Sequence, residues 1–345
     1  MSARSILPLG LLLPSLIIAK PILKDRLSKR APSYDVLGGA NFPDPSIINV
    51  DGLAYAFGTG DGAGNALPVT SNADFSNPSG WSEVRDSFPS DNVPAFGDNG
   101  WAAVNTIWAP DVTRLTDFDN SFAMYYAAAL KSNPAVHCLG VARSANVAGP
   151  YNDSSSQPWI CPEAEGGAID AAAFLDDDGT RYAVYKVDGP AANGGGYCAN
   201  TNNKPSTPIL LQQTESDGYA KVGSPIVLLD NNGEADRYQT EAPSILKGSD
   251  GTYFLFFSTG CFDDNSYTTS YATSTTGVKG PYGDRQVLLQ QGDGQFGPGG
   301  ADISFNIVDG GEIVYHSLKA NNDIGQGRVL NTGTITLAGR TARLN

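Results

Sequence analysis

Five acidic residues stand at the entrances of short apolar stretches, where a side chain can face a cavity while the strand behind it stays packed. They are Asp44, Asp111, Asp170, Glu241 and Asp302. Several carboxylates in one cleft raise one another's pKa, which is costly unless the charges are used. A carboxylate pair about 6.5–9.5 Å apart leaves room for water, as inverting hydrolysis of a glycosidic bond requires. A serine hydrolase is disfavoured, because Gly-x-Ser-x-Gly is absent and the chain has only 2 histidines.

The five acids belong to an internal repeat. Each copy reads as a strand, a tight turn of the type that closes β-hairpins, and a second strand. The turns fall at Asp51-Gly52, Asp119-Asn120, Asp178-Gly179, Asp250-Gly251 and Asp309-Gly310. Repeats of about 60–70 residues with four strands each are typical of propeller blades, so we expect an all-β, five-bladed β-propeller whose central channel holds the site. A β-sandwich with coincidental turns is the alternative, and pairing of residues 34–39 with 332–337 would close the ring.

The first thirty residues read as a removable leader. Arg4 precedes an apolar run over residues 6–19 that is too short to span a membrane but suits a signal peptide. We predict a signal peptide over 1–19, a propeptide over 20–30 that ends at the dibasic Lys29-Arg30, and a single catalytic domain over 31–345. The protein would then be secreted; an ordinary N-terminal tail is the alternative.

The net charge limits the classes of binding partner, and the cysteine content predicts disulfides. Processing would remove six of the 22 basic and one of the 36 acidic residues, and so change the formal net charge from −14 to −19. This acidity argues against nucleic acid and anionic membranes as partners, and we expect a soluble monomer. Four cysteines in an exported chain predict two disulfides, with all three pairings open. Asn152 begins the one glycosylation sequon.

The ordered set of motifs resembles glycoside hydrolase family 43. The set reads NFPDPSII, IWAPDV, AIDAAAFLDDDG, TEAPSIL with DGTYFLFFS, and GPGGADI, and it covers nearly all of the chain after the leader. This resemblance implies a five-bladed propeller, an inverting mechanism, and substrates such as arabinan, arabinoxylan or the oligosaccharides derived from them.

The same resemblance implies roles for three of the acids. Asp44 matches the general base that activates water, and Glu241 matches the general acid that protonates the leaving oxygen. Asp170 matches the third carboxylate, which orients the acid and keeps it protonated. Chemistry agrees, because the acid needs a nearby anion and the base needs a polar setting to stay ionised. Asp111 is interpreted as a structural or hydrogen-bonding residue.

Four further residues are candidates for binding substrate. Trp108 and Phe174 offer aromatic faces on which a sugar ring can stack, although packing in the core is the alternative for both. Arg328 falls where the resemblance places an arginine that reaches the site. His316 is the candidate that faces the channel, and we expect it to form hydrogen bonds rather than bind a metal.

No metal site or required cofactor is expected. Zinc is disfavoured because the cysteines lack C-x-x-C spacing. Many relatives carry a histidine after Gly-Pro-Gly, near an axial ion that is usually calcium, but this chain has Gly299-Gly300-Ala301 there. Structural calcium stays an alternative that no motif supports.

We therefore expect an exo-acting α-L-arabinofuranosidase or β-xylosidase, because the long loop after Gly189 would crowd the site and favour chain ends. Within the enzyme class, the alternative is an endo-1,5-α-L-arabinanase, which needs an open groove. From a different class, the alternative is a carbohydrate-binding propeller that has lost its activity.

Overall fold

Five antiparallel sheets make up this computed structural model, which describes residues 32–89, 93–192, 198, 206–292, 294–307 and 310–345. Each sheet is one propeller blade, formed by strands consecutive in sequence. Blade 1 holds β1 (Ser46–Val50), β2 (Leu53–Phe57), β3 (Pro68–Asn72) and β4 (Arg85–Asp86), and blade 2 holds β5 (Ala102–Arg114), β6 (Phe122–Leu130) and β7 (His137–Ser144). Blade 3 holds β8 (Ala168–Leu175), β9 (Arg181–Val187), β10 (Ile209–Thr214) and β11 (Lys221–Leu229).

The remaining two blades follow the same order. Blade 4 holds β12 (Thr240–Lys247), β13 (Tyr253–Thr259), β14 (Thr268–Ser274) and β15 (Gly283–Leu289), and blade 5 holds β16 (Phe296–Ile307), β17 (Gly310–Leu318), β18 (Arg328–Ala338) and β19 (Thr341–Leu344). One short helix, α1 (Gly189–Ala192), and four 3₁₀ turns (Pro94–Phe96, Glu163–Glu165, Gly233–Asp236, Ile324–Gln326) complete the described elements. Among the residues that the structure describes, no helix is long and apolar enough to cross a membrane.

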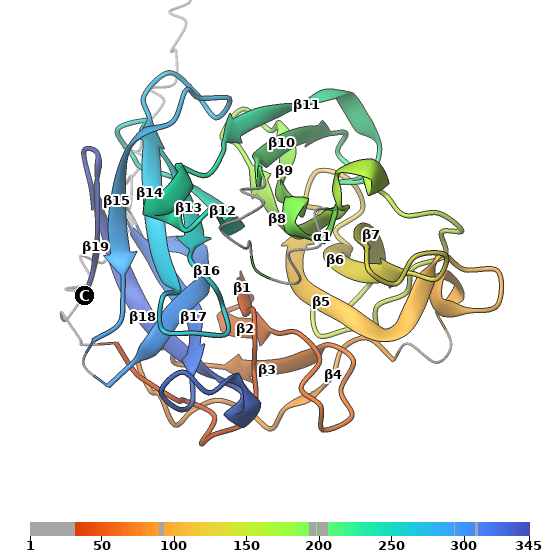
Figure 1. Ribbon diagram of the computed structural model, residues 1–345, viewed down its shortest axis with the longest axis horizontal. Coiled ribbons are helices and arrows are strands. Elements are labelled where there is room, and N and C mark those ends of the chain that lie inside the picture. The colour runs from red at the N-terminus through yellow and green to blue at the C-terminus, as the bar shows by residue number, and fades with distance from the viewer. Residues whose placement is uncertain (1–31, 90–92, 193–197, 199–205, 293, 308–309) are drawn as a thin grey trace, which may run out of the picture.

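The first strand of each blade lies innermost. Figure 1 shows the sheets arranged around a common centre, with β1, β8, β12 and β16 close to it. Each of the five first strands contacts the first strand of both neighbouring blades, so the five form a closed ring. The structure is thus the expected five-bladed propeller.

The apolar core is divided into five clusters, one between each pair of neighbouring blades. Phe57 and Met124 lie in the cluster between blades 1 and 2, and Phe42 and Val314 lie in the one between blades 5 and 1. The other three fill the junctions between blades 2 and 3, 3 and 4, and 4 and 5. Because every blade buries both of its faces, strands such as β6 read as continuous apolar runs rather than alternating ones.

The two ends of the described chain close the ring, but through residues 33–36 and 330–332 rather than through the predicted 34–39 and 332–337. Ser33 pairs with Thr332, with N–H···O distances of 2.8 and 2.9 Å, and the amide of Val36 donates to Leu330 at 3.0 Å. The segment before β1 thus runs beside β18 of the last blade, and blade 1 is tied to blade 5. The leader expected over residues 1–30 lies outside the described residues.

The hairpin turns stand where the repeat places them. Asp51 and Gly52 both have positive φ, 50° and 84°, as a two-residue type I′ turn requires. The turn at Asp309 lies outside the described residues, but β16 and β17 pair antiparallel on either side of it.

Two disulfides form, as the cysteine count predicts. Cys138 pairs with Cys161 and Cys198 pairs with Cys261. The first links β7 to the segment that leads into blade 3, and the second links the segment between α1 and β10 to the β13–β14 loop. Sequence separation alone does not select this pairing, because it depends on which loops the ring brings together.

Candidate active site

A residue in the left-handed region of φ lies just before the first strand of blade 1 and within the first strand of each other blade. The five are Asp44 (47°), Ala109 (43°), Asp170 (58°), Ala242 (47°) and Gly300 (59°). In blades 2 to 5 the strand register shifts at this position. The extra residues form a bulge, which re-aims side chains at a strand end. Proline beside three of these positions, Asp44, Ala109 and Ala242, leaves no amide there to be orphaned where pairing breaks.

These left-handed residues correct the expectation that the five acids occupy equivalent positions. Asp44 and Asp170 are the left-handed residues of blades 1 and 3, whereas Glu241 comes one residue earlier in its blade. Asp111 and Asp302 come two residues later in theirs. Relative to the left-handed residue of their blade, the acids therefore stand at three different positions: at that residue, one residue before it, or two residues after it.

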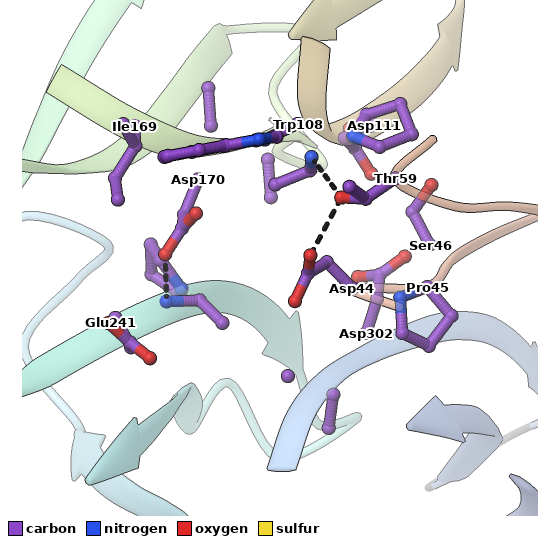
Figure 2. Close-up of a pocket in the computed structure, with 18 of the residues that line it drawn as sticks. Asp44, Pro45, Ser46, Thr59, Trp108, Asp111, Ile169, Asp170, Glu241 and Asp302 are labelled. Carbon is purple, nitrogen blue, oxygen red and sulfur yellow. Dashed lines mark hydrogen bonds between the residues drawn. The ribbon is translucent and has the colours of Figure 1, made fainter. Parts of the chain in front are cut away.

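The five acids nevertheless line one pocket of about 250 Å³. Figure 2 shows Asp44 on one side of it and Asp170 with Glu241 on the other. Of the residues expected to bind substrate, Trp108 and Arg328 also line this pocket.

Asp44 is held as an anion. Its Oδ1 lies 2.5 Å from Nη1 of Arg328, its Oδ2 accepts a hydrogen bond from Nη2 at 3.3 Å, and the hydroxyl of Thr59 donates to Oδ2 at 2.7 Å. Burial works against the charge, but the guanidinium beside it outweighs burial, and together with His316 and Thr59 it holds the pKa of Asp44 below its usual value. A carboxylate that stays ionised in a partly closed site is suited to accept a proton from water.

Asp170 has the opposite character. Burial and the neighbouring charge of Glu241 raise its pKa to about 7, although the ammonium of Lys186 opposes this shift. Its Oδ2 accepts a hydrogen bond from the backbone N–H of Ala242 at 2.9 Å. Asp170 thus holds the backbone directly after Glu241, and Figure 2 shows this contact between blades 3 and 4.

Glu241 is 5% exposed, and two side-chain donors lie on the same oxygen of its carboxyl group. Lys186 donates to Oε2 at 2.9 Å, and the amide of Gln239 donates to Oε2 at 2.7 Å. Lys186, which is fully buried, also lies 3.3 Å from Oδ1 of Asp188. Oε2 of Glu241 is therefore held by two donors, and the hydroxyl of Tyr267 is a further hydrogen-bonding neighbour of the carboxyl group.

His316 lies behind Asp44 and does not line the pocket. It is fully buried, and its Nδ1 accepts a hydrogen bond from the backbone N–H of Asp44 at 3.0 Å. Burial, and then the charge of Arg328, lower the pKa of His316 to about 3, so the ring is neutral. The expectation that it forms hydrogen bonds is met, but the expectation that it binds substrate is corrected: the histidine instead fixes the loop that carries Asp44.

Two glycines make room for this arrangement. A Cβ on Gly300 would lie 2.5 Å from Cε1 of His316, and one on Gly299 would lie 2.2 Å from the ring of Tyr267. The rings of Tyr267 and His316 stack with centroids 5.5 Å apart. The two aromatic rings thus occupy the space that side chains on these glycines would need.

Of the two aromatic residues expected to bind substrate, only one lies at the pocket. Trp108 lines the pocket, half-buried, with its ring stacked on that of His137 at 3.5 Å. Phe174 does not line the pocket, so the prediction that it binds substrate is corrected. It lies near the far end of β8, pairs with Tyr182 in register and packs edge-on against Tyr253. Four residues along a strand carry a side chain about 13 Å from the entrance.

Asp111 and Asp302 join neighbouring blades. Oδ2 of Asp111 accepts the amide of Ala173 at 2.8 Å, and Oδ2 of Asp302 accepts the amide of Ile47 at 2.8 Å. Ser244 donates to the other oxygen of Asp302 at 2.7 Å. Asp111 thus has the hydrogen-bonding role expected from the sequence.

Comparison with known proteins agrees with this architecture. A family model described as "Glycosyl hydrolases family 43" matches residues 36–339. The chain belongs to this family. Family 43 is a family of inverting glycoside hydrolases. The resemblance seen in the motifs is therefore confirmed, and so is the assignment to the glycoside hydrolases.

The relatives of this family-43 chain include arabinanases. It is 26% identical over 264 residues to "Extracellular endo-alpha-(1->5)-L-arabinanase 2" of Bacillus subtilis, covering 70% of this chain and 50% of the relative. It is 26% identical over 319 residues to the same organism's "Extracellular endo-alpha-(1->5)-L-arabinanase 1", covering 85% and 86%. The chain thus spans about half the length of the first of these relatives.

A solved structure shares the fold. The crystal structure of a thermostable family-43 glycoside hydrolase superposes with a TM-score of 0.72 at 20% identity, covering 88% of this chain and 93% of the other. At this identity the likeness concerns the fold alone.

Several pocket residues of this family-43 protein were missed from the sequence. They are Thr59, Asp188, Phe262 and Tyr267, which line the pocket, and Lys186, which lies behind Glu241. For Lys186 there was a signal, because a lysine inside the apolar run Tyr182–Val187 has no solvent to reach. Arg328 lies with its guanidinium 4.9 Å from the ring centre of Phe262, a contact between blades that no local pattern predicts.

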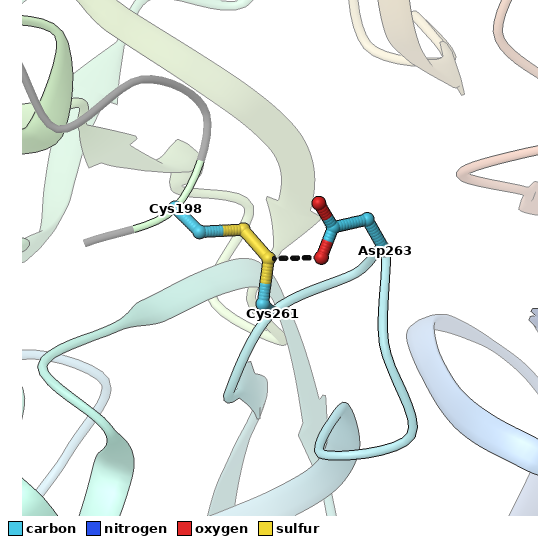
Figure 3. Close-up of side chains that lie close together, drawn as sticks. All are labelled: Cys198, Cys261 and Asp263. Carbon is cyan, nitrogen blue, oxygen red and sulfur yellow. Dashed lines mark hydrogen bonds between the residues drawn. A yellow bond between two sulfur atoms is a disulfide. The ribbon is translucent and has the colours of Figure 1, made fainter. Parts of the chain in front are cut away.

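One cluster has the residue types of a metal site. Cys198, Cys261 and Asp263 offer atoms within 4.8 Å of one another. Figure 3 shows the three side chains. The two sulfurs are joined to each other, so neither is the thiolate that metals require. The sulfur of Cys261 lies 2.8 Å from Oδ1 of Asp263, a close contact without a shared proton, since a disulfide carries none. The cluster therefore does not support a metal site.

Proposed function

We propose that this protein is an endo-acting hydrolase of α-1,5-linked L-arabinan that inverts the anomeric configuration. The observation that carries the catalytic part is the contrast between two sides of one pocket. Asp44 is paired with Arg328, whereas Asp170 holds a pKa of about 7 beside Glu241. One side is suited to accept a proton and the other to hold one, which is the division of labour of an inverting glycosidase.

The reaction balances with these groups alone. Asp44 removes a proton from a water molecule as the water oxygen bonds to the anomeric carbon. On the other side, Glu241 gives its proton to the glycosidic oxygen as the bond between that oxygen and the anomeric carbon breaks. The products are a free sugar end of inverted configuration, an alcohol on the departing sugar, a protonated Asp44 and an ionised Glu241.

The names of the relatives favour arabinan and endo action over the exo-acting arabinofuranosidase or β-xylosidase expected from the sequence. That expectation rested on residues 185–189 and the long loop after Gly189 crowding the site. Lys186 and Asp188 are buried and pair with each other, and most of the loop, residues 193–197 and 199–205, lies outside the described residues. Secretion is part of the proposal: it is supported by the two disulfides and by the relatives named as extracellular.

The test is hydrolysis of debranched arabinan, with oligosaccharide products separated by chromatography and their anomeric configuration followed by NMR. The panel adds aryl α-L-arabinofuranoside and aryl β-D-xyloside. We expect a ladder of oligosaccharides whose new ends appear first in inverted form. Release of arabinose alone would replace endo with exo action, and first products of retained configuration would refute the mechanism. Binding of arabinan without any turnover would instead support an inactive binding propeller.

A further inference from the structure

Lys186 is the fully buried cation beside Glu241, and the catalytic steps above do not use it. It lies on β9 of blade 3, whereas Glu241 lies on β12 of blade 4. Its Nζ contacts two carboxylates, Oε2 of Glu241 at 2.9 Å and Oδ1 of Asp188 at 3.3 Å. Burial disfavours an ammonium ion, but the charges of Glu241, Asp188 and Asp170 outweigh burial and raise the pKa of Lys186 above its usual value. The lysine is therefore charged at every pH at which the enzyme would work.

Two donors to Glu241 use a single oxygen. Lys186 and Gln239 occupy the two lone pairs of Oε2. Oε1 is therefore the oxygen left for the acid's proton, and the hydroxyl of Tyr267 is a further hydrogen-bonding neighbour of this carboxyl group. Once that proton has gone to the leaving oxygen, a new carboxylate stands 2.9 Å from an ammonium ion in a nearly closed site, where opposite charges attract more strongly than in water.

We propose that Lys186 is a positioning residue for the general acid: it aims Oε1 of Glu241 at the leaving oxygen and stabilises the carboxylate that forms as the proton departs. This inference rests on the proposed role of Glu241 as the acid. It also predicts that removing the Lys186 ammonium moves the upper pH limit of activity, because a nearby cation favours a carboxylate over the carboxylic acid.

Several other groups face this pair and share in that limit. They are Asp170 from β8, Asp188 after β9, Tyr267 before β14 and Asp263 in the β13–β14 loop, with Asp44 across the pocket from Asp170. Asp188 is the member that can be changed without touching the proposed acid or base. Its negative charge opposes that of Lys186, so the two residues push the upper limit in opposite directions.

The experiment compares the pH dependence of kcat/KM on arabinan in wild type, Lys186→Met, Lys186→Arg and Asp188→Asn. In Lys186→Met the upper limit should move to higher pH by about 1–3 units, because the acid no longer has a cation beside it. In Asp188→Asn it should move to lower pH by about one unit. Lys186→Arg keeps the charge and should leave the limit in place. Lys186→Met should also lose about 10²-fold in kcat on arabinan but little on an aryl glycoside whose leaving group needs no proton.

Lys247→Met is the matched control. Lys247 is also paired with two carboxylates, Asp176 at 2.8 Å and Asp177 at 2.9 Å, but it does not line the pocket. Its loss should leave the upper pH limit where it is. A purely structural role for Lys186 would lower stability and kcat on both substrates alike, without moving the limit.

A second experiment tests the inference without substrate. The infrared band of protonated carboxyl groups is followed against pH, and the spectrum of Glu241→Gln is subtracted from that of the wild type to isolate Glu241. The same opposite shifts are expected with Lys186→Met and Asp188→Asn. Should Lys186→Met not fold, Lys186→Gln replaces it, with the same expected shift, because Asp188 also acts directly on Glu241. An unmoved titration, or shifts of the same sign in both variants, would overturn the inference. A wild type that hydrolyses none of the sugars would refute the proposed function instead, and the titration would still report on Lys186.

Discussion

Nη1 of Arg328 lies 2.5 Å from Oδ1 of Asp44, although 284 residues separate the two along the chain. Ring closure brings them together, because the backbone carbonyl of Arg328 also accepts the amide of Phe42 at 2.8 Å. Arg328 can therefore tune Asp44 only in a closed propeller, and this makes the proposed base sensitive to the joint between blades 5 and 1.

Replacing Arg328 with alanine should raise the lower pH limit of activity. The arginine is the largest influence that lowers the pKa of Asp44, so without it the carboxylate takes up a proton at higher pH. Activity on the acid side should fall first, while the upper limit stays in place. The measurement is kcat/KM against pH, with Arg340→Ala as control, since Arg340 pairs with Asp284 at the surface. An unchanged lower pH limit would show that protonation of Asp44 does not limit activity, and would contradict its role as the general base.

Asp44→Asn and Glu241→Ala should respond differently to the leaving group. Without the base, no group can take the proton from water, so Asp44→Asn should lose at least about 10³-fold on both arabinan and activated aryl glycosides. Glu241→Ala should lose about 10²–10⁴-fold on arabinan and much less on the aryl substrate. Steady-state rates on both substrates check this. Equal losses in Glu241→Ala on the two would contradict its role as acid.

Gly300→Ala should destabilise the protein more than Gly339→Ala. Both glycines have positive φ, 59° and 56°, so each substitution pays a similar backbone cost of about 1 kcal/mol. Only at Gly300 would the new Cβ meet a ring, 2.5 Å from Cε1 of His316, whereas it would meet nothing within 4 Å at Gly339. Urea unfolding should show the larger loss at Gly300, together with lower activity, because His316 holds the backbone of Asp44. Equal losses would show that the His316 ring can move aside.

Removing the Cys138–Cys161 disulfide should lower the free energy of unfolding by about 3 kcal/mol, as expected for a loop of this size. The double variant Cys138→Ser/Cys161→Ser should keep its pH profile, because neither residue lines the pocket. Thermal and urea unfolding of this variant, with wild type as reference, give the measurement. A shifted pH profile would reveal a coupling to the site that the structure does not contain.

Much of the architecture is readable in local chemistry. Asp-Gly turns mark hairpins because few residues adopt positive φ without cost, and their recurrence predicts blades. The positions of the bulges cannot be predicted from local sequence in this way. Asp44, Asp111 and Glu241 look alike as acids within two residues of a proline, and only the backbone φ values reveal that they stand at three different registers.

The sequence by itself determined the repeat, the blade number, the family and the identity of the proposed acid and base, since each depends on residues that are neighbours in the chain. Tertiary structure decided the pairing of the cysteines, the absence of Phe174 and His316 from the pocket lining, and the partners of each carboxylate. Lys186 meets Glu241 across 55 residues and Arg328 meets Asp44 across 284. Charges act through space, so the properties of a carboxylate are set by neighbours that only the closed ring supplies.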